Sequence, residues 1–391
     1  MRPSARRRGD EVLSVYFDNS ATTAVLPEVA EFAKNIMINE YGNPSSLHHM
    51  GFMAEKLLTT SREQIARTLG CRNDEIYFTS CGTESNNLAV LGVAEAYKRR
   101  GNRIILSAVE HSSLMAVGKE LSSRGFEVIF IKPNESGEIT AESVLPFVNN
   151  STILVSVMCI NSETGAINDI VRIANRCKMK NPNLIFHSDC VQAYGKYSLA
   201  PLLKSVDLIS ASGHKIHAPK GSAFLYRKKG VRIRPLYFGS MQEGGLHSGT
   251  ENVPAFAALG MAAEIAYKSL SENQEHLKEL YTYFMDRLRC MDGVVLNSPL
   301  KNGAFHIINI SLIGIRSEII LHYLEQYEIY VSTGSACSKG KKSHVLTAMG
   351  LGDARIDSAI RVSFSELNTK DEIDFFFQKL EEAMENITKA N

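Results

Sequence analysis

The sequence predicts an α/β fold in which a large domain holds a mostly parallel sheet and a smaller α+β domain follows it. The first observation is that strand-like apolar runs alternate with helix-like stretches between about residues 53 and 226. The second is that this alternation stops near residue 255, where longer helical patterns begin. Such alternation indicates a sheet flanked by helices, whose ligands lie at the carboxyl ends of the strands.

The strand-like runs of the large domain are short and rich in Ile, Val, Leu and Phe. They lie at residues 75–79, 103–106, 127–131, 152–157 and 184–187. Helical stretches such as 83–100 and 168–180 lie between them. Short polar segments follow these strands, and we expect the functional residues there.

The carboxyl-terminal part is predicted to have long helices at about 255–290 and 369–388, and strands at 305–311 and 359–364. We therefore expect three parts along the chain. They are a basic tail at 1–14, a large domain at 15–255 whose first residues could pack with the small domain, and a small α+β domain at 256–391.

The composition excludes several classes of protein. The 391 residues are 44% hydrophobic, and 43 basic against 42 acidic residues give a net charge of +1, so no global field attracts a membrane or nucleic acid. No apolar run approaches the roughly 18 residues of a membrane span. The Arg-rich start lacks the apolar core of a secretory signal, which leaves a basic tail or, alternatively, an organelle-targeting remnant. We expect a cytoplasmic protein without membrane or direct nucleic-acid partners.

The seven cysteines are scattered, with no Cys-x-x-Cys pair and no Cys/His cluster at zinc spacing. This pattern argues against a disulfide framework, fits a reducing compartment and predicts no metal site. Cys337 differs from the others because it lies in a small-residue loop with three lysines after it. Neighbouring cations lower a thiol pKa, so Cys337 is the candidate nucleophile. The other six are interpreted as small core residues, with Cys81 and Cys190 beside the candidate site.

Lys215 is the strongest candidate catalytic residue. It follows an apolar run at 206–209 and lies among small and hydroxylated residues in the segment 210–221. A lysine in this position can form a Schiff base with an aldehyde cofactor, while Ser212 and His214 donate to a phosphate. The string alone is equally compatible with a surface lysine in a Gly/Ser loop.

Asp189 and Gln192 follow the strand at 184–187. A pyridoxal ring acts as an electron sink when its nitrogen stays protonated, and a buried carboxylate enforces this. We assign that role to Asp189, with Gln192 at the ring hydroxyl. The alternative is that Asp189 caps the next helix.

Two further segments follow strands. Gly82 and Thr83 open a predicted helix, whose amides and Thr83 hydroxyl would bind a phosphate unless the segment only caps the helix. His111 follows the strand at 103–106, where an imidazole could stack on a planar cofactor or serve only as a structural hydrogen-bond partner.

Together these segments resemble the cysteine desulfurases of the class V aminotransferase group, in particular the NifS/IscS-like branch. The matching segments run along nearly the whole chain, at 16–23, 42–46, 79–87, 110–111, 161–165, 189–192, 212–215, 248–250, 335–337 and 360–363.

The resemblance implies a fold-type I homodimer that uses pyridoxal 5'-phosphate. It implies Lys215 as the Schiff-base lysine, His111 stacked on the ring, Asp189 at the ring nitrogen and Gln192 at the ring hydroxyl. It also implies a phosphate site built by Thr83, Ser212 and His214, with Thr250 of the partner subunit.

The resemblance further implies L-cysteine as substrate, its carboxylate bound by Asn161 and Arg361, and its sulfur carried as a persulfide on Cys337. The sulfur would pass to an acceptor such as an iron–sulfur scaffold or a tRNA-thiolation enzyme. A lysine-rich, shorter loop after Cys337 leaves the acceptor open. Alternatives within the fold are a selenocysteine lyase or an aminotransferase, and outside catalysis a sulfur-transfer platform.

Overall fold

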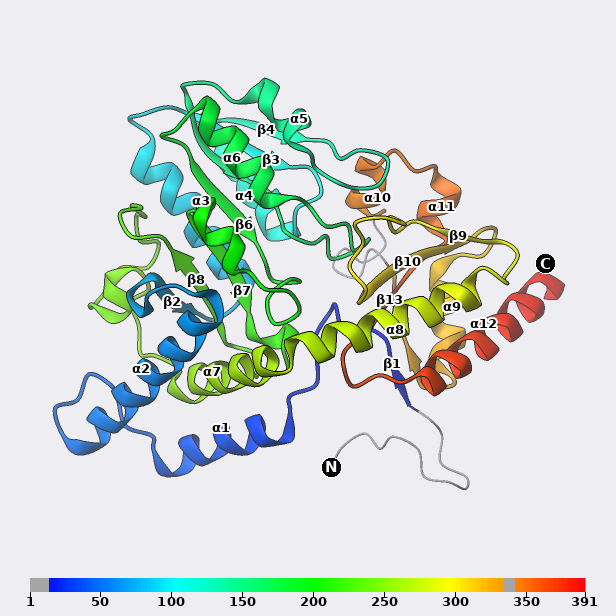
Figure 1. The fold of residues 1–391 in the computed structure, drawn as a ribbon, viewed down its shortest axis with the longest axis horizontal. Coiled ribbons are helices and arrows are strands. Elements are labelled where there is room, and N and C mark those ends of the chain that lie inside the picture. The colour runs from blue at the N-terminus through cyan, green and yellow to red at the C-terminus, as the bar shows by residue number, and fades with distance from the viewer. Residues whose placement is uncertain (1–13, 334–341, 391) are drawn as a thin grey trace.

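The computed structural model describes residues 14–333 and 342–390. Within these residues a seven-stranded sheet has the order β2-β8-β7-β6-β5-β3-β4 (Figure 1). All neighbouring pairs are parallel except the two that β8 makes. Its strands are β2 Ile76–Thr79, β3 Arg103–Ser107, β4 Glu127–Ile131, β5 Thr152–Ser156, β6 Ile185–Asp189, β7 Leu208–Ser212 and β8 Ala223–Arg227. The predicted mostly parallel sheet is confirmed.

Helices cover both faces of this sheet because its strands are apolar on both sides. Ile104 and Leu208 pack with α3 and α4, whereas the next residues, Ile105 and Ile209, pack with the helices of the opposite face. The helices of the large sheet are α1 Pro27–Asn39, α2 His49–Leu69, α3 Gly82–Tyr97, α4 Ser112–Ser123, α5 Ala141–Val144, α6 Ile170–Lys180 and α7 Val253–Lys268. The two-residue alternation therefore fixes which helix each side chain meets.

The helix expected at about 255–290 is two helices. α7 ends at Lys268 and α8 spans Leu270–Leu288. Between them Ser269 has φ −104° and ψ 17°, outside the helical region, so the uninterrupted expectation was wrong. α7 packs in the core of the large sheet and α8 continues toward the smaller one (Figure 1).

The smaller sheet has the order β12-β13-β10-β9. Its core also contains Val15 and Phe17 from the start of the described chain, and β1 pairs in parallel with β11. The proposed domain ranges remain a prediction. The elements here are β1 Val15–Tyr16, β9 Val294–Leu296, β10 Ile307–Leu312, α9 Ser317–Glu325, β11 Ile329–Tyr330, β12 Ser332–Thr333, α10 His344–Ala348, α11 Asp353–Asp357, β13 Ala359–Ser363 and α12 Lys370–Ala390.

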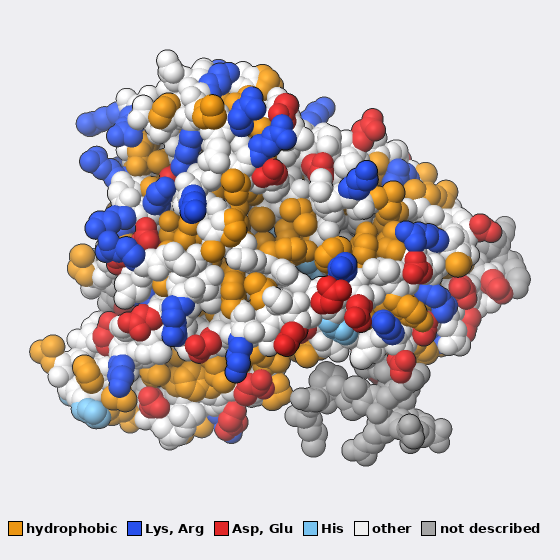
Figure 2. All heavy atoms as spheres, viewed as in Figure 1, with side chains coloured by type: hydrophobic (Ala, Val, Ile, Leu, Met, Phe, Trp, Pro, Cys, Tyr) orange, Lys and Arg blue, Asp and Glu red, His pale blue; other side chains and the backbone are white. Residues whose placement is uncertain are grey.

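The face shown in Figure 2 carries basic and acidic side chains side by side, in line with the near-zero net charge. Among the described residues, no helix has the length and apolar character to cross a bilayer. The same residues contain no group of three His, Cys, Asp or Glu side chains that could hold a metal ion.

Candidate active site

The candidate site lies at the carboxyl ends of β6 and β7. Asp189 is the last residue of β6 and Ser212 the last of β7, and these strands are parallel neighbours. Lys215 closes a one-turn 3-10 helix directly after β7. The sheet thus brings together two segments that the sequence places more than twenty residues apart.

Lys215 is buried, with 7% of its surface exposed. Its Nζ donates to the backbone carbonyls of Ser20 and Ala21, the latter at 2.6 Å. Gln192 Nε2 donates to the same Ser20 carbonyl at 3.0 Å. The alternative of a surface lysine is therefore wrong, and Lys215 and Gln192 meet at the segment that follows β1.

Asp189 is held by two donors. Asn86 Nδ2 donates to Oδ2 at 2.7 Å, and the Val191 backbone N–H donates to Oδ1 at 2.9 Å. The second bond is the local turn-capping role that the sequence left open, but it uses only one carboxylate oxygen. The other oxygen is oriented by a helix 103 residues away in the chain.

Asn86 also links Asp189 to His111. Its Nδ2 donates to Ser113 Oγ at 3.1 Å, and that hydroxyl lies 2.8 Å from His111 Nδ1. The Ser113 backbone N–H donates to the same nitrogen at 3.2 Å, which leaves the ring proton on Nε2. Burial lowers the His111 pKa; Asp189 opposes this shift and Lys215 adds to it. The imidazole is therefore neutral at pH 7.

The space beside the first residue of α3 is narrow. A Cβ on Gly82 would come within 2.9 Å of Val191 Cγ2 and 3.7 Å of Ser212 Cβ. Gly82 begins α3, and no side chain caps this helix end. Ser212 Oγ is buried without a hydrogen-bond partner. An anion is favoured here, because the first backbone N–H groups of α3, the positive end of its dipole and the unpartnered Ser212 hydroxyl lie together.

His214 and Thr83 are the other residues of this chain that were predicted to hold the phosphate. His214 Nδ1 lies 3.3 Å from Thr22 Oγ1, and burial together with the neighbouring Lys215 lowers the His214 pKa to about 3. A neutral imidazole still carries one N–H that can donate. Thr83 is exposed in this single chain.

Arg361 lies on β13, and its guanidinium is already partly engaged. Nη2 bonds Asp18 at 2.7 Å and Nη1 donates to the Ser162 carbonyl at 2.9 Å. Its Nε is buried and has no hydrogen-bond partner. The ion pair that the sequence allowed is therefore present, and Nε is the guanidinium nitrogen that no group of the described residues engages.

Asn161 is fully buried in the turn next to Arg361. Its Oδ1 accepts from the backbone N–H groups of Glu163 and Thr164, both at 2.9 Å, and its Nδ2 donates to the Val109 carbonyl at 3.0 Å. These bonds build the turn, so a substrate would compete with them for the Asn161 amide. This turn-forming role of Asn161 was not predicted.

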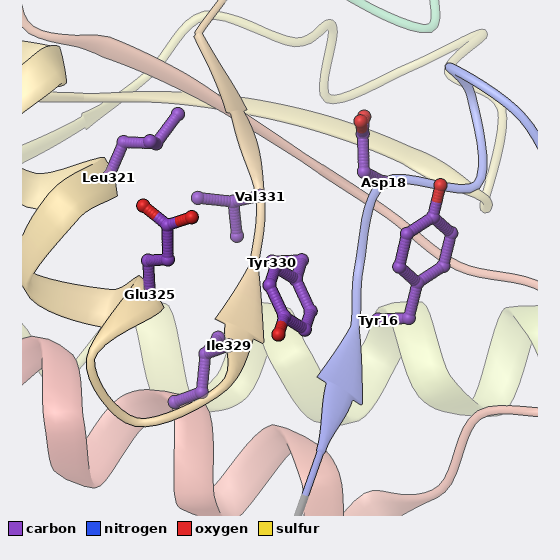
Figure 3. A pocket seen from close by; sticks show the side chains of 7 residues that line it. All are labelled: Tyr16, Asp18, Leu321, Glu325, Ile329, Tyr330 and Val331. Carbon is purple, nitrogen blue, oxygen red and sulfur yellow. The ribbon is translucent and has the colours of Figure 1, made fainter. Parts of the chain in front are cut away.

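A hollow of about 360 Å³ lies beside Asp18, between β1 and the β11–α9 segment (Figure 3). Neither Lys215 nor Asp189 lines it. The lining side chains are Tyr16, Asp18, Leu321, Glu325, Ile329, Tyr330 and Val331. The hollow therefore meets the candidate site through Asp18, the partner of Arg361.

Comparison with known proteins identifies the family. The class-V aminotransferase family model matches residues 15–376. This chain belongs to the class-V aminotransferase family. A "NifS/IcsS protein homolog" of Lactobacillus delbrueckii is 41% identical over 96% of this chain and 99% of the relative. "Cysteine desulfurase IscS" of Clostridium botulinum is 36% identical over 94% and 93%.

The fold agrees with solved structures of the same group. A NifS-like protein superposes with a TM-score of 0.91 at 38% identity, over 95% of this chain and all of that one. A NifS-like protein from Rickettsia africae gives 0.86 at 32% identity, over 95% and 99%. The resemblance to the NifS/IscS-like branch, and the fold-type I architecture that it implied, are confirmed.

The assignments of Thr250 and Cys337 remain predictions. Thr250 is exposed in the described chain, and Cys337 lies outside the described residues. The flanks of that gap adjoin the site: Ser332 pairs with Arg361 on β13, and His344 Nε2 donates to the Glu110 carbonyl at 2.9 Å.

The remaining cysteines differ in burial. Cys159, Cys177 and Cys190 are buried as expected, whereas Cys71 and Cys81 are partly exposed. Cys290 is exposed, so its interpretation as a core residue was wrong. It follows the end of α8, where the apolar pattern no longer faces the core.

Sequence reasoning missed Asn86, Ser113 and the carbonyl of Ser20. Asn86 lies four residues after Gly82 on α3, and this spacing places both on one helix face. That spacing was a usable signal. The role of Ser20 had no local signal, because a carbonyl acceptor has no residue type.

Proposed function

We propose that this chain is a pyridoxal-phosphate-dependent cysteine desulfurase that converts L-cysteine to L-alanine and carries the sulfur as a persulfide on Cys337. The proposal rests on one observation. The buried amine of Lys215 and the buried carboxylate of Asp189, which accepts two hydrogen bonds, follow the ends of adjacent strands. Relatives named cysteine desulfurase, 36–38% identical over 94–95% of the chain, support the same reaction.

The described residues fit the cofactor. Ser212 Oγ and Gln192 Oε1 are buried polar atoms without partners, and Gly82 keeps the space beside Ser212 open. When bound, pyridoxal phosphate supplies an electron sink for the bonds around the substrate Cα. The residues that we assign to holding it are Lys215, Asp189, His111, Gln192, Gly82, Thr83, Ser212 and His214.

Three of these side chains have distinct chemical tasks. The Asp189 carboxylate, fixed by Asn86, holds a proton at the ring nitrogen. The neutral His111 ring packs on the planar group and can donate through Nε2. The Lys215 amine serves as the proton acceptor for the substrate Cα. Burial around these groups excludes water and strengthens their electrostatic interactions.

Arg361 is assigned to the substrate carboxylate, next to Asn161. Its unpartnered Nε is the donor available without rearrangement, and exchange of Asp18 for the substrate would add Nη2. A guanidinium can then bind a carboxylate through two parallel hydrogen bonds.

The sulfur step is a nucleophilic displacement on sulfur. The Cys337 thiolate attacks the substrate sulfur, the carbon–sulfur bond breaks, and the sulfur stays on Cys337 as a persulfide. Protonation of the remaining three-carbon unit gives alanine, so one cysteine and one enzyme thiol yield one alanine and one persulfide. A thiol acceptor or reductant then removes the outer sulfur.

The protein partners form part of the same proposal. We infer a cytoplasmic homodimer in which Thr250 of the partner subunit completes the phosphate site. Thr250 is exposed in the single chain, as are the nearby large apolar side chains Phe238 (80%) and Met241 (77%). Exposed apolar patches of this kind mark protein interfaces. The sulfur acceptor is a protein such as an iron–sulfur scaffold or a tRNA-thiolation enzyme.

The test uses purified protein loaded with pyridoxal phosphate, L-cysteine and a thiol reductant. Wild type should release equal amounts of sulfide and alanine. Cys337→Ser should keep the visible cofactor band and lose both products, and Lys215→Ala should lose the band. Cys290→Ser, which removes an exposed cysteine, is the control and should behave as wild type. Normal turnover by Cys337→Ser would refute the nucleophile assignment.

A further inference from the structure

A buried lysine that the proposed mechanism does not use lies under the Lys215 loop. Lys196 follows β6 in the turn after Gln192, and only 6% of its surface is exposed. Its Nζ donates to the backbone carbonyl of Lys215 at 2.7 Å. The preceding Gly195 has φ 74°, and a Cβ there would come within 2.4 Å of Ile216 Cγ2. The turn is therefore pressed against the peptide chain on both sides of that carbonyl.

The charge of Lys196 is partly offset by Glu366, which follows β13. Burial lowers the pKa of Lys196 to about 8, and Glu366 opposes this shift. Burial raises the pKa of Glu366, but His217 and Lys196 outweigh it and bring that pKa to about 2. Both side chains are therefore charged at neutral pH. His217 Nε2 lies 3.4 Å from Glu366 Oε1, and His217 Nδ1 donates to the Ala24 carbonyl at 2.7 Å.

Lys196, His217 and Glu366 connect the three chain segments that carry the candidate site. Lys196 belongs to the segment of Asp189, His217 to the segment of Lys215, and Glu366 lies five residues after Arg361. A buried lysine charge is expensive to desolvate, and an apolar side chain of similar volume would stabilise the fold at least as well. A role in holding the Lys215 peptide in place would explain why a charged residue occupies position 196.

The charge of Lys196 also reaches the site. Lys196 is among the cations that lower the pKa of His214 on one side, and after burial it is the first cause of the lowered pKa of His306 on the other. A nearby positive charge disfavours a second positive charge. Lys196 thus places a positive charge at the backbone carbonyl of Lys215, and Glu366 partly offsets that charge.

We propose that Lys196 is a positioning residue for Lys215, holding its peptide through the carbonyl and tuning the charge of the group attached to its amine, with Glu366 as the counter-ion. The inference rests on the proposed function, because it concerns Lys215 as the attachment point of the cofactor. The ionisable groups around this loop are Lys196, His111, Asp189, His214, His217, Lys220, His306 and Glu366.

The experiment is a pH titration of the visible absorbance of the cofactor-loaded protein without substrate. Lys196→Met removes the cation and leaves Glu366, so the midpoint should rise by at least about half a pH unit. Glu366→Gln leaves the cation without its counter-ion, so the midpoint should fall. Lys379→Met is the control, because Lys379 is a partly buried lysine paired with Glu382 at 2.8 Å on α12.

A purely structural role would not move the two midpoints in opposite directions. An unchanged midpoint in Lys196→Met, or shifts of the same sign in both variants, would overturn the inference. If Lys196→Met does not fold, the sign of the Glu366→Gln shift decides. Absence of the band from wild type would instead refute the proposed function, so the two failures are distinguishable.

Discussion

Asn86 offers the sharpest test of how the site is organised, because it touches Asp189 and the His111 network without reaching the reacting atoms. It is 1% exposed, and its Nδ2 donates to Asp189 at 2.7 Å and to Ser113 at 3.1 Å. Asn86→Leu keeps the approximate volume and removes both bonds. Asp189 would then keep only the backbone donor of Val191.

The expected magnitude follows from these bonds. A hydrogen bond to a charged group contributes about 1.5–3 kcal/mol, so the apo variant should lose about that much unfolding free energy. The substitution also costs binding free energy, because the Asp189 carboxylate must be held in one orientation to meet the ring nitrogen. We expect cofactor affinity to fall by about tenfold, equivalent to about 1.4 kcal/mol.

The assay measures cofactor affinity by titrating the apo protein and following absorbance, with urea unfolding in parallel. The matched control is Asn181→Leu. Asn181 is also a buried amide that donates twice, to the Asn149 and Thr152 carbonyls at 2.9 Å each, away from Asp189. It should lose similar stability and keep wild-type affinity. Equal affinities for Asn86→Leu and wild type would refute the claim that Asn86 orients Asp189.

Three further outcomes follow from single contacts. Arg361→Lys should raise the KM for cysteine about tenfold with a smaller change in kcat, because an ammonium cannot form the planar fork; an unchanged KM would contradict the carboxylate assignment. Burial raises the Glu110 pKa to about 8 from 4.5, so native protein holds a proton that the unfolded chain releases, and unfolding free energy should fall between these pH values. Denaturant titrations at several pH values should show no such fall in Glu110→Gln. An equal fall in the variant and in wild type would contradict the assignment of this proton to Glu110. Gly82→Ala should lower the apo unfolding midpoint and weaken cofactor binding about tenfold, because its Cβ would crowd Val191 at 2.9 Å and lie 3.7 Å from Ser212 Cβ; an unchanged affinity would contradict the phosphate assignment.

The parts of the fold that depend on local pattern were predictable from the sequence. The strand expected at 103–106 is β3 Arg103–Ser107, and the one at 359–364 is β13 Ala359–Ser363. Polar residues directly after parallel strands meet at one sheet edge, which is why Asp189 and Lys215 could be placed together. The prediction of one helix at 255–290 was wrong because the apolar pattern continues across Ser269, whereas the helical backbone is interrupted there.

The supporting contacts could not be predicted, because they join residues far apart in the chain. Asn86 and Asp189 are 103 residues apart, and the partner of the Lys215 amine is a carbonyl 195 residues earlier. Asn161 illustrates the converse case. Its residue type suits a substrate carboxylate, but its Nδ2, the group that would donate to a carboxylate, already donates to the Val109 carbonyl at 3.0 Å. Residue type alone does not tell whether an amide is available.

The segment at residues 18–21 joins the two ends of the proposed reaction. Asp18 bonds Arg361 on the smaller sheet, while the carbonyls of Ser20 and Ala21 accept from Lys215 on the larger one. A substrate carboxylate that displaces Asp18 would therefore release the start of a turn whose last residues hold the Lys215 amine. Asp18 and Ala21 are joined by a turn in which the Ala21 backbone N–H donates to the Asp18 carbonyl at 2.9 Å, so a shift of Asp18 is passed on to Ala21. Substrate binding at Arg361 should thus change the surroundings of Lys215 before any bond is broken.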